Sequence, residues 1–196
     1  MIEESDSPLE VFRLVPPFGD RYLGLLIDGG PVIRWELDSE ANELPPVICG
    51  ERHGNAKGVA AEYPSGHPFA PVLSRRLTEA TRSRFQDFGH YIPVTAPGLQ
   101  PGDYSAYVPT MVADCLDRDA SSSPNAAGEI ERAVFVPEEL PLDAPCFRLT
   151  DNKTYVYWNG WAARLIRSLV GAENIELRLV WSSDPQATPH PRPMGF

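Results

Sequence analysis

The segment Val112-Ala-Asp-Cys-Leu-Asp-Arg-Asp-Ala-Ser121 decides how the middle of the chain divides into structural elements. It closes a predicted strand over 105–115 with an acidic end, and a run of serines follows it. A second apolar run covers 130–136. The pattern predicts that strands 105–115 and 130–136 pair antiparallel, and that a mobile loop joins them.

The N-terminal region predicts a hairpin. Residues 22–27 form a compact apolar run, Asp28-Gly-Gly30 is a turn signal, and residues 32–37 alternate apolar and charged side chains. Such alternation is typical of a half-buried antiparallel strand, so strand 22–27 is expected to pair with strand 32–37. Residues 38–72 are rich in Pro and Gly and are expected to form a long irregular connection, with room for one short strand at Val47–Cys49.

Helical periodicity appears at two places. Ser74 is a predicted cap for a helix over 74–86, and Gly171 is placed to end a helix over 160–170. A strand precedes and follows each helix, which gives two strand–helix–strand modules. Two explanations for these modules stay open: a diverged internal duplication, or the independent occurrence of a common supersecondary unit. The apolar positions of these elements predict residues that are largely buried: Leu77, Phe85, Phe135, Phe147, Leu165, Leu169 and Leu177.

These elements predict an α+β fold with a largely antiparallel sheet and two short amphipathic helices. The 21 prolines also argue against a helical bundle. We expect a single α+β domain over 1–182, which could divide into two lobes of about 1–100 and 101–182. Residues 183–196 form a proline-rich tail that is expected to be extended or disordered.

The net charge of −10 is unevenly distributed. Residues 1–50 and residues 101–151 each contain ten acids and three bases, so each block carries −7. Nucleic-acid binding needs a concentrated Lys/Arg surface and is disfavoured. A basic protein partner is favoured because complementary charge speeds encounter. The alternative is an acidic surface that serves solubility alone.

The sequence contains no stretch of apolar residues long enough to span a membrane, so no membrane partner is expected. The first six residues lack the basic and apolar parts of a secretory signal. The three cysteines are an odd number without a Cys-x-x-Cys pair, which disfavours a disulfide framework and a zinc site. These features predict a cytoplasmic protein without a cofactor.

Cys115 is the residue that could act as a nucleophile, with His53, His67 or His90 as its base. No nucleophile signature surrounds it, and the strand phase points it inward as a small apolar filler. We therefore predict no catalytic residues.

The aspartates of the opening segment lack the spacing of a calcium-binding loop. Asp117 is expected to stabilise the loop by accepting backbone N–H groups, as turn aspartates do. Asp114 and Asp119 would then stay available to a partner. We predict no metal-binding and no cofactor-binding residues.

Five segments between about residues 70 and 182 carry a likeness to known proteins: Val72–Leu77, Tyr91–Val94, Val112–Ser121, Cys146–Leu149 and Tyr155–Val180. Their order resembles the immunity proteins of bacterial polymorphic toxin systems, in particular the large family with an Asp-Cys/Ala-Leu-Asp…Ser strand end. The resemblance implies a cytosolic antidote that binds and blocks a cognate protein toxin, and it implies no active site.

Two groups of acidic residues are candidates for contact with the basic surface of such a toxin. The preferred group flanks the connection between strands 105–115 and 130–136: Asp114, Asp119, Glu129 and Glu131. The second group ends the predicted hairpin: Glu36, Asp38, Glu40 and Glu43. Two other functions stay open, a small cytosolic hydrolase that uses a loop histidine and carboxylates, and a structural or adaptor protein of a phage or secretion apparatus.

Overall fold

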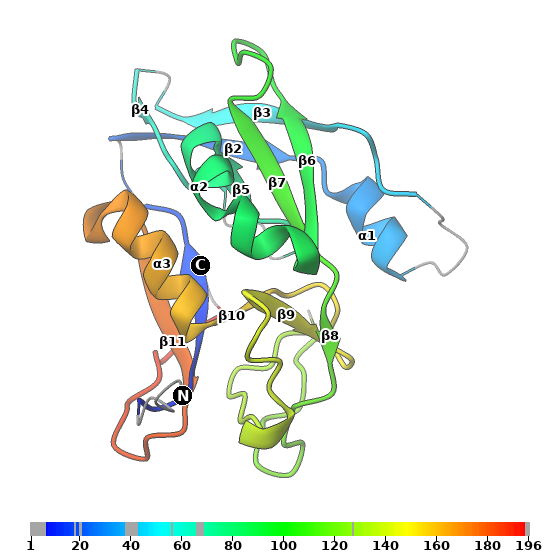
Figure 1. Ribbon diagram of the computed structural model, residues 1–196, viewed down its shortest axis with the longest axis vertical. Helices are drawn as coiled ribbons and strands as arrows, with labels where there is room; N and C mark the ends of the chain where they lie inside the picture. The colour runs from blue at the N-terminus through cyan, green and yellow to red at the C-terminus, as the bar shows by residue number, and fades with distance from the viewer. Residues whose placement is uncertain are drawn as a thin grey trace.

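Two β-sheets and three α-helices make up the described part of this computed structural model, namely residues 7–17, 19, 21–37, 43–55, 57–65, 69–126 and 128–194 (Figure 1). Most strand pairs in both sheets are antiparallel. The predicted α+β class is therefore confirmed.

The larger sheet occupies the upper half of Figure 1 and has the strand order β4-β2-β3-β6-β7-β5. Its strands are β2 (Tyr22–Ile27), β3 (Ile48–Gly54), β4 (Val59–Ala60), β5 (Val72–Ser74), β6 (Gly89–Thr95) and β7 (Tyr104–Pro109). The pairs β2–β4 and β3–β6 are parallel. Helix α1 (Gly30–Leu37) lies at one end of this sheet.

The smaller sheet lies in the lower half and has the order β11-β1-β10-β9-β8. Its strands are β1 (Glu10–Val15), β8 (Val112–Ala113), β9 (Cys146–Leu149), β10 (Tyr157–Asn159) and β11 (Glu176–Ser182). Only β8 and β9 pair in parallel among its described strands.

The two strand–helix–strand modules are confirmed and share one topology. Helix α2 (Arg75–Phe85) joins β5 and β6, which flank β7, and helix α3 (Gly160–Val170) joins β10 and β11, which flank β1. The side chain of Ser74 caps α2 by accepting the N–H of Leu77 at 3.2 Å. Gly171 ends α3 with a φ of +88°, a value that favours glycine.

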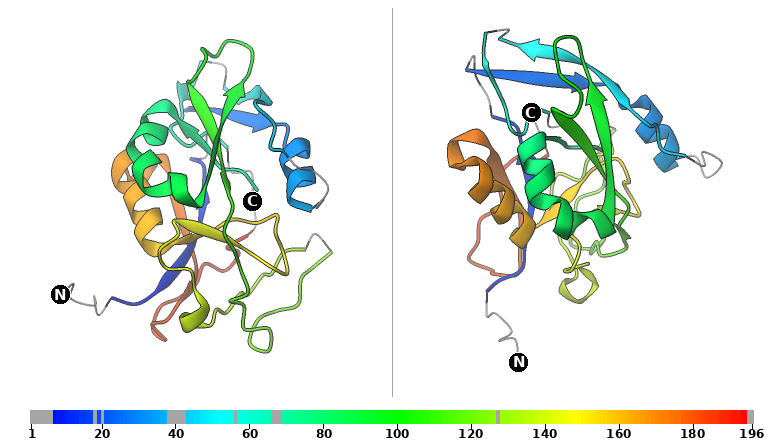
Figure 2. Two further views of the ribbon diagram at one scale, coloured as in Figure 1. Left: turned by 45° about the vertical axis from the view of Figure 1, so that its right-hand side comes forward. Right: turned by 45° about the horizontal axis from the view of Figure 1, so that its top comes forward.

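Helices α2 and α3 contact each other and lie side by side in both views of Figure 2. They bury one apolar cluster in which the ring of Phe85 lies 5.6 Å from Tyr107 and 6.1 Å from Trp158, between ring centroids. Burial is confirmed for four of the predicted core residues: Leu77, Phe85, Phe135 and Phe147.

Leu165, Leu169 and Leu177 were also expected to be largely buried, and they are partly buried at the margin of the cluster. In α3 the buried face includes two alanines, and its members with side chains are Ala162, Ala163, Ile166 and Val170. Small side chains let the helix approach the sheet closely, and the leucines one residue away flank the contact.

The predicted hairpin of 22–27 with 32–37 is wrong, because the second segment is helix α1. The carboxylate of Asp28 accepts the N–H of Gly30 at 3.0 Å, and Pro31 stands in the first turn, where it suits a helix. Strand β2 pairs instead with β3 and β4, both of which lie inside the segment expected to be irregular.

The predicted pairing of 105–115 with 130–136 is also wrong. Strand β7 stops at Pro109, pairs with β5 and β6, and the chain then crosses to the smaller sheet. Residues 130–136 form no strand, and one isolated bridge joins Phe135 to Leu116. Proline lacks the N–H that would continue the ladder.

Residues 183–194 of the expected tail pack against the smaller sheet. The N–H of His190 donates to the carbonyl of Leu179 in the edge strand β11 at 2.8 Å, and Met194 is buried in an apolar cluster with Cys115 and Phe147. This segment thus covers part of a strand edge that would otherwise be open.

Candidate functional site

The acidic residues of the preferred group lie on the segment that follows β8, in the lower right of Figure 1. Asp114 is exposed and forms an ion pair with Arg118, which also pairs with Asp151 at 2.8 Å. The hydrogen bond from Arg118, helped by one from Thr150, lowers the pKa of Asp114 below its ordinary value. Asp119 and Glu131 are also exposed.

Glu129 has a different role from the one expected. It is partly buried, and its carboxylate accepts the hydroxyl of Tyr155 at 2.8 Å and the amide of Asn125 at 3.0 Å. The bond to Tyr155 ties the loop to the segment that leads into β10, so Glu129 is occupied inside the molecule and is a poor contact residue.

Hydrogen bonds link the described parts of the connection after β8 to one another. Asp117 accepts the N–H groups of Asp119 at 3.1 Å and Ala120 at 3.0 Å, as predicted for a turn aspartate. The N–H of Ser122 donates to the carbonyl of Arg132 at 2.9 Å. The two halves of the connection therefore support each other.

Sequence reasoning missed further acids in the same region. Glu138, Glu139 and Asp143 are exposed and enter no ion pair with any described residue. The first two follow Pro137 in a short 3-10 turn, Pro137–Glu139. The Pro-Glu-Glu sequence, a common start for a helical turn, was the signal that could have singled them out.

In the second group, Glu36 is not available to a partner. Its side chain is 1% exposed and forms an ion pair with Arg148 of β9, whose side chain is 2% exposed. Burial raises the pKa of Glu36 to about 7, and the charge of Arg148 opposes that rise. Glu43 is exposed, whereas Asp38 and Glu40 lie outside the described residues.

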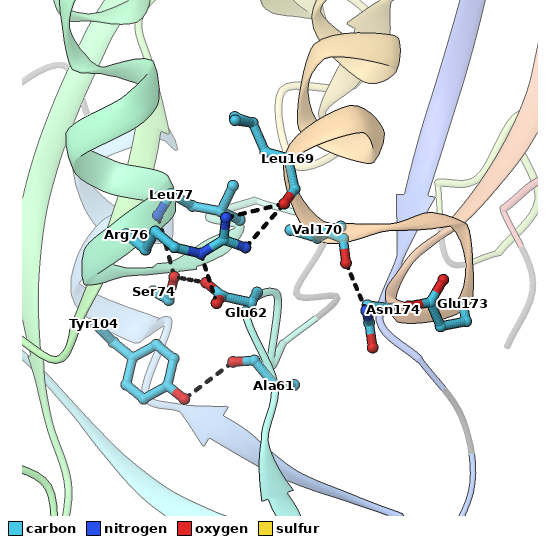
Figure 3. Close-up of polar contacts among 10 residues, drawn as sticks. All are labelled: Ala61, Glu62, Ser74, Arg76, Leu77, Tyr104, Leu169, Val170, Glu173 and Asn174. Carbon is cyan, nitrogen blue, oxygen red and sulfur yellow. Dashed lines mark hydrogen bonds and ion pairs between the residues drawn. The ribbon is translucent and has the colours of Figure 1, made fainter.

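A separate feature, which we call the arginine hollow, lies beside the start of α2 and has a volume of about 420 Å³. Leu23 and Leu25 of β2 line it, because alternate residues of this strand face inward. Arg52 of β3 is the register partner of Leu25 and therefore lies on the same face. Tyr104 closes the far side by donating its hydroxyl to the carbonyl of Ala61 at 3.0 Å (Figure 3).

The polar side of the arginine hollow is a network that ties α2 to the end of α3 (Figure 3). Glu62 accepts hydrogen bonds from Ser74 and from Arg76, the latter at 2.9 Å. Both terminal nitrogens of Arg76 donate to the carbonyl of Leu169 at 3.0 Å. The sequence offered no signal for this site, since its residues come from distant elements.

The cysteine–histidine hypothesis finds no geometric support in the described residues. Cys115 is fully buried in the lower apolar cluster, and burial raises the pKa of its thiol to about 12. His53 is exposed on β3 of the other sheet, and His90 is exposed on β6. His67 lies outside the described residues. A thiol with a raised pKa is a weak nucleophile.

Thiol labelling tests this arrangement directly. Iodoacetamide at about pH 8 should modify the native protein at Cys49 alone, because Cys49 is exposed while Cys115 and Cys146 are buried with raised pKa values. In denaturant all three cysteines should react, which serves as the control. Peptide mass spectrometry gives the sites, and rapid native labelling of Cys115 would reopen the nucleophile hypothesis.

No protein-family model matches the chain, and no curated protein matches its sequence. Among the described residues, no group of His, Cys, Asp and Glu is placed to hold a metal ion. None of the helices in the described ranges has the length and apolar character needed to cross a bilayer.

Proposed function

We propose that the protein is a binding protein of the immunity type, which blocks a protein toxin by covering a basic surface of that toxin. The observation that carries this proposal is the acidic loop surface: Asp119, Glu131, Glu138, Glu139 and Asp143. These side chains are exposed, are unpaired with any described base, and stand on a connection that internal hydrogen bonds hold in place.

An ordered loop favours binding because less conformational entropy is lost when the partner docks. The unpaired carboxylates favour a basic partner, because they gain Coulomb energy without first breaking an ion pair of their own. Two bases, Arg118 and Arg132, lie on the same connection, where the exposed acids outnumber them, and Arg118 is already paired with Asp114 and Asp151. The acidic loop surface therefore keeps an excess of negative charge.

The product of the gene beside this one is the first partner to test, since an antidote is useful where its toxin is made. Expression of that product alone should arrest growth of a bacterial host, and co-expression of the present protein should restore it. Direct binding of the two purified proteins should accompany the rescue. A neighbour that is harmless, or that never binds this protein, would count against the immunity proposal.

Charge steering gives a quantitative prediction. Asp119→Asn, Glu131→Gln and Glu138→Gln together should slow association with the toxin about tenfold at low salt, because steering charges act mainly on the association rate. Raised salt should slow the wild type and bring the two rates together. Stopped-flow measurement of the rate against ionic strength provides the data.

A matched control removes the same charge elsewhere, with Glu51→Gln, Glu79→Gln and Asp87→Asn, all exposed and outside the connection between β8 and β9. This control should keep most of the wild-type rate. Equal slowing by both triple variants would assign the effect to net charge. An association rate that does not change with salt would show that charge does not steer binding.

A further inference from the structure

The arginine hollow contains three arginines and two acids, and their environments differ. Arg76 is matched by Glu62, and Arg75 is matched by Asp103 at 3.3 Å. Arg52 has no acidic partner and no hydrogen-bond acceptor among the described residues. The lining charge is therefore +3 − 2 = +1, and the unmatched cation is Arg52.

A second donor remains beside it. Arg75 uses Nε and Nη2 to bond the carbonyls of Gly102 and Pro101, each at 3.1 Å, and these bonds fix its direction. Its Nη1 has no partner in the described part of the chain. Guanidinium groups present paired donors that suit carboxylates.

Apolar side chains make up much of the remaining wall of the arginine hollow. Leu23 and Leu25 are buried, and the ring of Tyr104 together with Leu99 adds to the wall. A volume of about 420 Å³ lies within the range of small-molecule sites, which combine apolar walls with a few polar groups.

We propose that the arginine hollow binds a small organic carboxylate, with its anionic group on Arg52 and Arg75 and its apolar body against Leu23 and Leu25. A single negative charge matches the lining charge of +1. A phosphate dianion would bring excess charge toward Glu62 and Asp103, and a cation would meet Arg52. This binding site is separate from the acidic loop surface and does not rest on the immunity function.

The test uses the full-length protein labelled with 15N and four probes: phenylacetate, its neutral isostere phenylacetamide, acetate, and phenyl phosphate. Phenylacetate should give saturable amide shifts confined to the residues around the arginine hollow. Phenylacetamide and acetate should bind at least about tenfold more weakly, because one lacks the charge and the other lacks the apolar body.

Arg52→Gln should weaken phenylacetate binding about tenfold. Amide signals of this variant that match those of the wild type away from the substitution would show that the fold is intact. The matched control Arg84→Gln changes an exposed arginine of α2 outside the arginine hollow and should bind as the wild type does. Four results would overturn the proposal: no saturable shifts with phenylacetate, equal binding of phenylacetamide, tighter binding of phenyl phosphate, or equal loss in both arginine variants.

Discussion

Replacing Phe147 by alanine should lower the free energy of unfolding by about 3–5 kcal/mol. Phe147 is fully buried in β9, its ring stacks with Tyr157 at 5.9 Å, and Phe135 meets it edge-on at 5.8 Å, between centroids. Deletion of the ring removes these contacts and leaves a cavity that strands on both sides prevent from closing. Urea unfolding followed by tryptophan fluorescence measures the change.

Phe88→Ala is the matched control, because the same group is deleted at a half-buried position at the end of α2. Its loss should be clearly smaller, since fewer atoms leave a packed environment. A loss below about 1 kcal/mol for Phe147→Ala would contradict the packing of the lower cluster.

The second large effect is expected at the buried ion pair. Arg148→Met should lower the free energy of unfolding by about 3–5 kcal/mol at about pH 8, because Glu36 must then either stay buried as an unpaired carboxylate or take up a proton. The change also removes the hydrogen bond from Arg148 to the carbonyl of Phe69, 2.9 Å long. The double variant Glu36→Leu with Arg148→Met should recover most of the loss, since a buried pair replaced by apolar residues is often neutral.

The pH dependence of this variant has a definite sign. The folded-state pKa of Glu36, about 7, lies above its ordinary value of 4.5, so its stabilising contribution is complete below about pH 4.5 and is lost as pH rises through about 7. Without Arg148 that pKa rises further, and the loss extends to higher pH. Urea unfolding at about pH 5 and about pH 8 should show a steeper fall for Arg148→Met than for the double variant. Equal pH dependence of the two would show that Glu36 is not the titrating group.

The candidate surface was predicted only in part from sequence. The negative charge after β8 was visible in composition, and Asp119 and Glu131 are exposed as expected. Glu129 and Glu36 were chosen for charge alone, yet one is bonded to Tyr155 and the other is buried against Arg148. Sequence distance hides such partners: Glu36 and Arg148 come from α1 and β9, on opposite halves of the chain.

Local sequence by itself determined the two strand–helix–strand modules, since the helical period, the Ser74 cap and Gly171 act within a few residues. Tertiary structure alone decided which strands pair, because a strand's partner depends on backbone groups far away in the chain. Because β2 pairs with β3, residues 32–37 are not needed as its partner strand, and they lie in helix α1. It also assembled the arginine hollow, because the charged and apolar walls of that hollow come from β2, β3 and α2, which are separate in the sequence.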